Sequence, residues 1–419
     1  MSPLPELPET PASSALSAAT RRSILLLSFA TFASMAVQRL CDAMLPELAR
    51  VFDTSLAQAA HVISFFAVIY GLSQLIYGPI GDRLGKYRIV SVATLCCSLG
   101  CVLSVLSPSL VWLVWARVLT ALAAAAIIPL GMAWVGDHVS YEERQFTLAR
   151  VGVGTTMGIV GGQLMGGLFT DTVGWRWAFV FMALLFGVVG VLLIRDQRRQ
   201  PPRPTTPADL IQAPDRMLAS YLEQVRMIVT APWSRIVLTV AVIEGAAGFG
   251  VLAMWASHLY HTLDLSLSAA GATVAMFGVG GVFYMMLAKR LIPLLGEAGL
   301  TRVGVVLMGA CALVVAWGEW WWLAPPSCLV GGFGFFMFHN TMQANATQMS
   351  PAARGTGVSL FAASLFLGQS VGVVLAASLV AALGSAWVIV LGGALLVAEG
   401  FYFARALSRR EDLVKTFLA

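Results

Sequence analysis

The chain has 419 residues, of which 58% are hydrophobic and only 11% are Asp, Glu, Lys or Arg. A soluble protein carries about 25% charged residues, so this chain has too few polar side chains to cover a water-exposed surface. The composition excludes a soluble enzyme, a disordered chain and a nucleic-acid-binding protein as the main identity. The six Cys residues lie in apolar runs and lack the spacing of a metal site or of secreted disulfides, so no metal or cofactor is expected.

Runs of about 20 apolar residues, the length at which a helix crosses a bilayer, recur along the chain. They predict an all-α membrane protein. The twelve expected transmembrane helices are 23–48, 57–78, 89–107, 109–135, 149–170, 177–194, 235–257, 268–288, 302–322, 325–348, 356–382 and 386–404.

The positive charges predict the orientation of these helices. With both termini in the cytoplasm, most of the 26 Lys and Arg residues fall in cytoplasmic segments, and only Arg50 and Arg176 lie in connections on the opposite side. This asymmetry follows the rule that cytoplasmic loops are positively charged. The net charge of +5 therefore reports topology, and the expected location is a cell membrane of the bacterial inner-membrane type, crossed many times.

The apolar runs and polar connections divide the chain into five expected segments. A disordered cytoplasmic tail covers 1–22, and two six-helix bundles cover 23–194 and 235–405. A cytoplasmic tail covers 406–419, and a cytoplasmic linker covers 195–234. Within this linker, apolar side chains at helical spacing predict an amphipathic helix on the inner membrane surface. A passive tether is the alternative.

Shifting the chain by 210 residues reveals an internal repeat. The shift aligns Ser140 with Ser350, Arg144 with Arg354, Gly158 with Gly368, and Gly162 with Gly372. An offset of six helices, an even number, gives two halves of the same orientation. Parallel halves are typical of transporters that bind their ligand between the halves near the middle of the membrane.

The first predicted helix contains two charged residues, Arg39 and Asp42, three positions apart and therefore on one face. A charge in hydrocarbon is costly unless it is paired or reaches water, so each marks a functional candidate. Arg117, in the fourth helix, lies at about the depth of Asp42 and is expected to pair with it. A fixed salt bridge and a pair that responds to protons or ligand both remain open. Arg39 is expected to reach water at the outer surface.

The connection after the second helix carries the sequence GPIGDRLGKYRIV at 78–90. It resembles the loop signature of the major facilitator superfamily, G-x-L-a-D-R-x-G-[RK]-x-[RK], in the same place along the chain. The resemblance implies the fold of that family, twelve helices in two parallel six-helix halves, and a transport function. In this interpretation Asp82 faces the N-terminus of the eleventh helix, and Lys86 pairs with Asp137. The residues expected to form a conformational latch are Gly78, Asp82, Arg83, Gly85, Lys86 and Asp137.

The fifth predicted helix carries four glycines, Gly158, Gly162, Gly166 and Gly167. Their spacing resembles the antiporter signature G-x3-G-P-x2-G-G, with Gln163 in place of proline. Glycines at this spacing form a smooth helix face that allows another helix to approach closely. An antiporter function and close packing alone both remain open.

Glu244 lies ten residues into the seventh helix, near the middle of the membrane, and no basic residue shares this helix. Burial disfavours the charged form of a carboxyl group, and a group that changes charge as a cavity wets and dries is what proton coupling requires. Glu244 and Asp42 are therefore the predicted proton carriers. A neutral, hydrogen-bonded glutamic acid is the alternative.

Further polar side chains are expected to line a substrate cavity between the halves. These residues are Gln38, Arg39, Tyr70, Gln74, Arg117, His339, Gln343 and Gln369. Together with the resemblance, they predict a monomeric secondary transporter in the lipid bilayer that exports a small organic solute in exchange for protons, similar to drug/proton antiporters.

Three other functions are less consistent with the sequence. Proton-coupled uptake of an organic anion would use Arg39 and Arg117 as counter-charges. A membrane enzyme is disfavoured because the chain lacks the hydrolase, zinc-protease and nucleotide-loop motifs. A sensor would carry a soluble output domain.

Overall fold

The computed structural model describes residues 17–199 and 214–418, without the side chains of 82, 141–142, 144–146, 149, 214–219, 352 and 411–418. This part of the chain is almost entirely helical and contains no strand. The N-terminal half consists of α1 (Ala18–Arg39), α2 (Leu45–Val51), α3 (Leu56–Ala59), α4 (His61–Leu84), α5 (Lys86–Val105), α6 (Leu110–Ala124), α7 (Ile127–His138), α8 (Tyr141–Thr172) and α9 (Trp175–Gln197).

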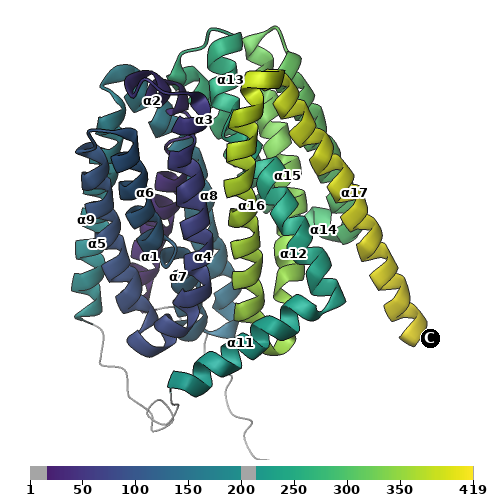
Figure 1. Ribbon diagram of the computed structural model, residues 1–419. Helices are drawn as coiled ribbons and strands as arrows, with labels where there is room; N and C mark the ends of the chain where they lie inside the picture. The colour runs from purple at the N-terminus through teal and green to yellow at the C-terminus, as the bar shows by residue number, and fades with distance from the viewer. Residues whose placement is uncertain (1–16, 200–213, 419) are drawn as a thin grey trace, which may run out of the picture.

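The C-terminal half packs beside the first half (Figure 1). Its α-helices are α11 (Pro214–Thr230), α12 (Pro232–Glu244), α13 (Trp255–Thr262), α14 (Leu267–Trp317), α15 (Ala324–Thr347), α16 (Arg354–Leu383) and α17 (Ser385–Leu418). The π-helical turn η1 (Gly245–Gly250) follows α12, and two short 3-10 turns are η2 (Trp321–Leu323) and η3 (Pro351–Ala353). Helix α11 lies crosswise at the end of the molecule opposite α2 and α13.

Nine helices or helix pairs in the described part of the chain are long and apolar enough to cross a membrane. The predicted number of twelve requires that α1 and α8 also cross and that α14 crosses twice. Helix α14 is continuous over 51 residues, but its backbone leaves the helical conformation at Gly296, where φ is 63°. The connection predicted between 288 and 302 is therefore helical, with Gly296 as its turning point.

Three predicted helices are broken where a continuous helix was expected. The first is divided into α1 and α2 by a turn at 40–44, and the fourth into α6 and α7. The seventh is divided into α12, η1 and α13. Such breaks redirect side chains by a large rotation about the helix axis, so the faces expected from an unbroken 3.6-residue period change after each break.

The predicted tails are corrected in part. Helix α1 begins at Ala18, inside the tail expected to be disordered, because the Ser17 side chain accepts a hydrogen bond from the Thr20 backbone N–H at 3.0 Å and caps the helix. Residues 1–16 lie outside the described residues. The C-terminal tail expected from 406 is a continuation of α17. In the linker, the predicted amphipathic helix is present as α11, whereas 200–213 lie outside the described residues.

The internal repeat is also present in the packing. A side chain at Gly158 or Gly162 of α8 would collide with the carbonyl groups of Phe32 and Ala36 of α1, respectively. The corresponding α16 positions, Gly368 and Gly372, meet the carbonyls of Val242 and Ala246. Each position in the second set follows its counterpart by 210 residues, so both halves use the same glycine-mediated contact between their first and fifth helices.

Candidate functional site

The buried charges of the N-terminal half form a cluster at the end of α1. Asp42 lies in the turn after α1, and its Oδ2 accepts hydrogen bonds from Arg39 Nη1 at 3.5 Å and from Gln163 Nε2 of α8 at 2.8 Å. Asp42, Arg39 and Gln163 are each 1% exposed. Gln163, which replaces the proline of the antiporter signature, is thus a partner of Asp42 that the sequence analysis did not assign.

Arg117 does not form the predicted pair with Asp42. Its guanidinium donates to the backbone carbonyls of Val37 at 2.6 Å, Gln38 at 3.4 Å and Val62 at 3.3 Å. The last carbonyl groups of a helix have no partner within it, and α1 ends at Arg39 in a fully buried position. Arg117 therefore caps α1 through hydrogen bonds to carbonyl groups, and Asp42 is near enough to interact with its charge without a direct salt bridge.

Arg39 does not reach the outer surface as predicted. Its guanidinium carbon lies 4.3 Å from the ring centroid of Phe249, a residue of η1 in the other half of the molecule. Cation–π contacts of this kind are strongest where water is excluded. Residues 39 and 249 are separated by the repeat offset of 210, and two equivalent positions touch each other only at the axis that relates the halves. The contact therefore marks the centre of the interface.

The C-terminal half carries its own buried pair. The Nδ1 atom of His339 on α15 lies 2.8 Å from Oε1 of Glu244, the last residue of α12. Glu244 is completely buried and the His339 side chain is 13% exposed. Glu244, expected to be unpaired, has a partner that the sequence analysis had placed only in the substrate cavity. The signal was available, because both residues are polar groups inside apolar runs.

Small residues explain the position of Glu244. The sequence GAAGFG forms η1 directly after it, and a side chain at Gly245 would collide with the Leu365 carbonyl of α16. At the other end of the turn, Gly250 lies against Gly372. Single π-helical turns frequently occur at functional sites, because they shift the register of the side chains that follow. Here the turn brings Phe249 to 5.9 Å from His339, measured between ring centroids.

A second carboxyl group accompanies Glu244. Glu399 of α17 is 5% exposed, and neither of its carboxyl oxygens has a hydrogen-bond partner among the described residues. Glu399 lies close enough to Glu244 for the two carboxyl groups to interact electrostatically. Glu399 was not among the residues predicted to form a site. The adjacent groups Glu244, His339 and Glu399 thus form a titratable cluster.

The other predicted cavity residues have different environments. Gln38 and Gln369 are both 1% exposed, and their amide atoms have no hydrogen-bond partner among the described residues. Tyr70 packs edge-on against Phe366 of the other half at 4.7 Å between centroids. Gln74 is buried, whereas Gln343 is exposed. A buried amide without a partner is unfavourable, because it has lost its hydrogen bonds to water without gaining others.

One of the contacts expected near the loop at 78–90 is present. Lys86 Nζ donates to Asp137 Oδ2 at 2.6 Å, which confirms this predicted pair. It joins α5 to α7 within one half, so this bond alone does not hold the two halves together. Gly85 has a φ of 91°, which favours glycine at the turn between α4 and α5. Gly78 has open space around it and Arg83 is exposed, while the side chain of Asp82 lies outside the described residues.

The halves are joined at both ends of the molecule. Asp171, at the end of α8, accepts hydrogen bonds from the backbone N–H groups of Leu267 at 3.2 Å and Ser268 at 2.5 Å, at the start of α14. Gly167 packs against the backbone carbonyl of Leu267, and Gly166 packs against the backbone carbonyl of Leu40. At the opposite end, the Tyr221 hydroxyl of α11 donates to the Leu75 carbonyl of α4 at 2.8 Å, and Thr356 of α16 donates to Gln224 of α11 at 2.8 Å.

Two parallel helical halves with charged residues buried at their shared axis are the architecture of a membrane transporter. The comparisons identify the family. The chain belongs to the Major Facilitator Superfamily, whose family model matches residues 27–356. It is thus a multi-pass membrane protein of a family of transporters rather than enzymes.

Individual relatives are distant. An uncharacterized transporter of the same type, YwfA of Bacillus subtilis, is 21% identical over 292 residues, which cover 70% of this chain and 68% of YwfA. The multidrug export protein EmrB of Escherichia coli is 26% identical over 167 residues, 40% of this chain and 32% of EmrB. A bacterial homolog of the human lysosomal transporter Spinster, solved in an inward-facing and unoccupied conformation, has a TM-score of 0.73 at 18% identity, covering 94% of this chain and 96% of that one.

Proposed function

We propose that the protein exports a small organic solute in exchange for protons, by alternating access of one central site to the two sides of the membrane. The contact between Glu244 and His339 is the observation that carries the proposal. A buried carboxyl group beside an imidazole can hold a proton between them or release it, because either the neutral pair or the ion pair is stabilised by the same hydrogen bond.

The position of this pair supports coupling between proton and solute. Phe249 contacts His339 on one side and the Arg39 guanidinium on the other, so the titratable cluster of one half is linked to the Arg39–Asp42 pair of the other. A change of charge at Glu244 or His339 would alter the packing at the axis between the halves. A titratable group that is in contact with both halves can shift the equilibrium between two conformations. Asp42 is the second proposed carrier.

The exporter assignment draws on the relatives. EmrB is named as a multidrug export protein, and the related EmrY as a probable multidrug resistance protein, although each aligns with less than half of this chain. Uptake of an organic anion is less well supported. The Arg39 charge has Asp42 as a partner, and the Arg117 guanidinium is engaged by three carbonyls, so neither arginine is left without a counter-group in the protein.

The topology proposed with this function places both termini in the cytoplasm of a bacterial cell, with the two halves forming one monomeric transport unit. The end of the molecule that carries α11 is then cytoplasmic, and the end where Asp171 contacts α14 is external. The lysine- and arginine-rich connections support this orientation.

Transport assays test the proposal. Purified protein is reconstituted into liposomes with an acidic lumen, and accumulation of ethidium and of tetraphenylphosphonium is followed with and without collapse of the gradient by nigericin. The gradient should accelerate uptake of at least one cation. Glu244→Gln keeps the size of the side chain but removes its ability to ionise. It should reduce this acceleration by about tenfold or more, because the coupling free energy between two linked sites typically corresponds to about 5- to 150-fold.

Glu223→Gln, at an exposed position on α11, is the matched control and should behave as the unchanged protein. Transport by Glu244→Gln that still follows the gradient would exclude Glu244 as the carrier. Accumulation of benzoate with an alkaline lumen, and of neither cation with an acidic one, would favour anion uptake over export.

A further inference from the structure

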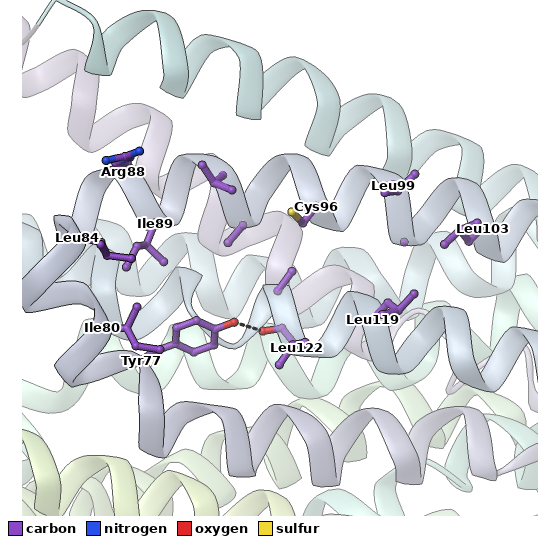
Figure 2. A pocket seen from close by; sticks show the side chains of 14 residues that line it. Tyr77, Ile80, Leu84, Arg88, Ile89, Cys96, Leu99, Leu103, Leu119 and Leu122 are labelled. Atoms are coloured by element: carbon purple, nitrogen blue, oxygen red, sulfur yellow. Dashed lines mark hydrogen bonds between the residues drawn. The ribbon is translucent and has the colours of Figure 1, made fainter. Parts of the chain in front are cut away.

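An apolar groove lies on the outside of the N-terminal half, between α4, α5 and α6 (Figure 2). Its volume is about 600 Å³. It follows α5 from Arg88 at one end, past Cys96, to Leu103 at the other, a distance of about 22 Å at 1.5 Å per residue. All lining side chains other than those of Arg88, Tyr77 and Cys96 are apolar. The Tyr77 hydroxyl is already engaged, because it donates to the Leu122 carbonyl at 2.6 Å.

A second groove of about 490 Å³ lies on the opposite face of α5, against α9. It is lined by Val102, Leu184, Val188 and Leu192, among others, and it ends at Arg195. The Ser98 hydroxyl at its wall donates to the Ala183 carbonyl at 2.7 Å. Like the first groove, it therefore offers no free hydroxyl group along its length, and its lining suits an apolar occupant.

Both arginines lie at the same end of the molecule. Tyr87, next to Arg88, donates to Asp196, next to Arg195, at 2.7 Å, which brings the start of α5 beside the end of α9. Arg88 and Arg195 are both exposed. Each groove thus presents one guanidinium group at the level of the lysine- and arginine-rich connections and a long apolar channel extending into the membrane from it.

The shape and charge define the occupant. A guanidinium group binds a phosphate through two parallel hydrogen bonds, and arginines at the membrane surface attract anionic headgroups. An apolar groove that faces lipid and lacks free hydroxyl groups suits an extended hydrocarbon chain. We propose that each groove binds an acyl chain of an anionic phospholipid from the adjacent leaflet, with the phosphate held by Arg88 in the first groove and by Arg195 in the second.

Cys96 provides a direct probe, because it lines the first groove and is exposed, whereas the other five cysteines are buried. The full chain in detergent is treated with N-ethylmaleimide while dioleoyl phosphatidylglycerol is added, and alkylation is followed by intact-mass spectrometry. Phosphatidylglycerol should slow alkylation of Cys96, and dioleoyl phosphatidylcholine at the same concentration should slow it much less. Inorganic phosphate alone should have no effect.

The arginine variants separate the grooves. Arg88→Gln should weaken protection of Cys96 by phosphatidylglycerol about fivefold, the effect of about 1 kcal/mol per basic residue near an anionic surface. Arg88→Lys should retain part of it, and Arg195→Gln should retain all of it. In native mass spectrometry, Arg195→Gln should lose one bound phosphatidylglycerol, whereas Arg290→Gln, outside both grooves, should lose none.

Two results would overturn the proposal. Equal protection by phosphatidylcholine would show that the groove takes any lipid chain without recognising the headgroup. Unchanged protection in Arg88→Gln, with the variant eluting as the same monodisperse species, would show that the arginine does not bind the phosphate. Both results concern lipid binding alone and are independent of proton coupling at Glu244.

Discussion

The buried Arg117 side chain donates its hydrogen bonds to backbone carbonyl groups and not to a ligand. Its three hydrogen bonds go to carbonyls of α1 and α4, and its guanidinium carbon lies 4.1 Å from the ring centroid of Phe66. A substrate anion would need the same donors. The geometry favours a structural function, in which Arg117 stabilises the buried end of α1 and thereby the turn that carries Asp42.

Replacement by lysine distinguishes these functions. Lysine keeps the charge but lacks the planar guanidinium group, so its single ammonium group cannot bond to all three carbonyls. Arg117→Lys should therefore lower the free energy of unfolding by about 2–4 kcal/mol, because buried carbonyl acceptors lose their donors. Thermal unfolding in detergent would measure the loss, with Arg405→Gln at an exposed position as the control. A fully stable Arg117→Lys that binds anionic solutes more weakly would instead indicate a ligand contact.

Helix packing depends on glycine at some positions and tolerates it at others. A Cβ atom at Gly162 of α8 would lie 2.5 Å from the Ala36 carbonyl oxygen, whereas nothing lies within 4 Å of the equivalent atom at Gly152 of the same helix. The sequence alone predicted a close-packing face at 158–167. The structure shows that Gly158 and Gly162 meet α1, Gly166 meets Leu40 in the turn after α1, and Gly167 meets α14.

The two positions should respond to alanine with opposite signs. Gly162→Ala forces α8 away from α1 and should destabilise the protein by about 1–3 kcal/mol, the usual effect of overpacking. Gly152→Ala adds only helix propensity and should stabilise it by up to about 1 kcal/mol. Gly372→Ala, at the repeat-related position, should behave as Gly162→Ala. Thermal unfolding of the three variants would check this, and an equal response at 152 and 162 would contradict the packing argument.

At the scale of the whole molecule, the halves are connected at both ends in this conformation. Asp171 binds the N-terminus of α14 at one end, and α11 bridges α4 and α16 at the other through Tyr221 and Gln224. Partial burial raises the pKa of the Tyr221 phenol, so its hydroxyl remains a donor across the physiological range. Alternating access requires that these two connections open in turn.

Weakening each connection should shift the conformational equilibrium in opposite directions. Tyr221→Phe removes one hydrogen bond and should raise the population open at the α11 end about fivefold, which corresponds to about 1 kcal/mol. Asp171→Asn should raise the population open at the other end. Two pairs of spin labels, introduced in a Cys96→Ser background, would measure these populations. The distance between labels at Leu84→Cys and Gly355→Cys reports opening at the α11 end, and the distance between labels at Val173→Cys and Trp387→Cys reports opening at the other end.

Tyr402→Phe, an exposed tyrosine on α17, is the control and should move neither distance distribution. If Tyr221→Phe leaves the distances at the α11 end unchanged, α11 does not hold the halves together, and the linker is the passive tether that the sequence allowed.

The sequence by itself determined the class of protein and the family. Both depend on local information: the length of an apolar run and the short signature at 78–90. The pair of Lys86 with Asp137 was also predictable, because it followed from the position of that signature beside the end of the fourth helix.

The tertiary structure decided which buried polar groups meet. Residue number gives the depth of a side chain in the membrane, and by depth Arg117 matched Asp42. The rotation of each helix about its axis is set by packing and by helix breaks, and α1 ends at Arg39 just before Asp42. The carboxylate therefore turns toward Gln163, and Arg117 binds the freed carbonyls of α1. His339 and Glu244 are 95 residues apart, and the close packing of η1 against α16 and, at Gly248, against Phe335 of α15 brings their helices together.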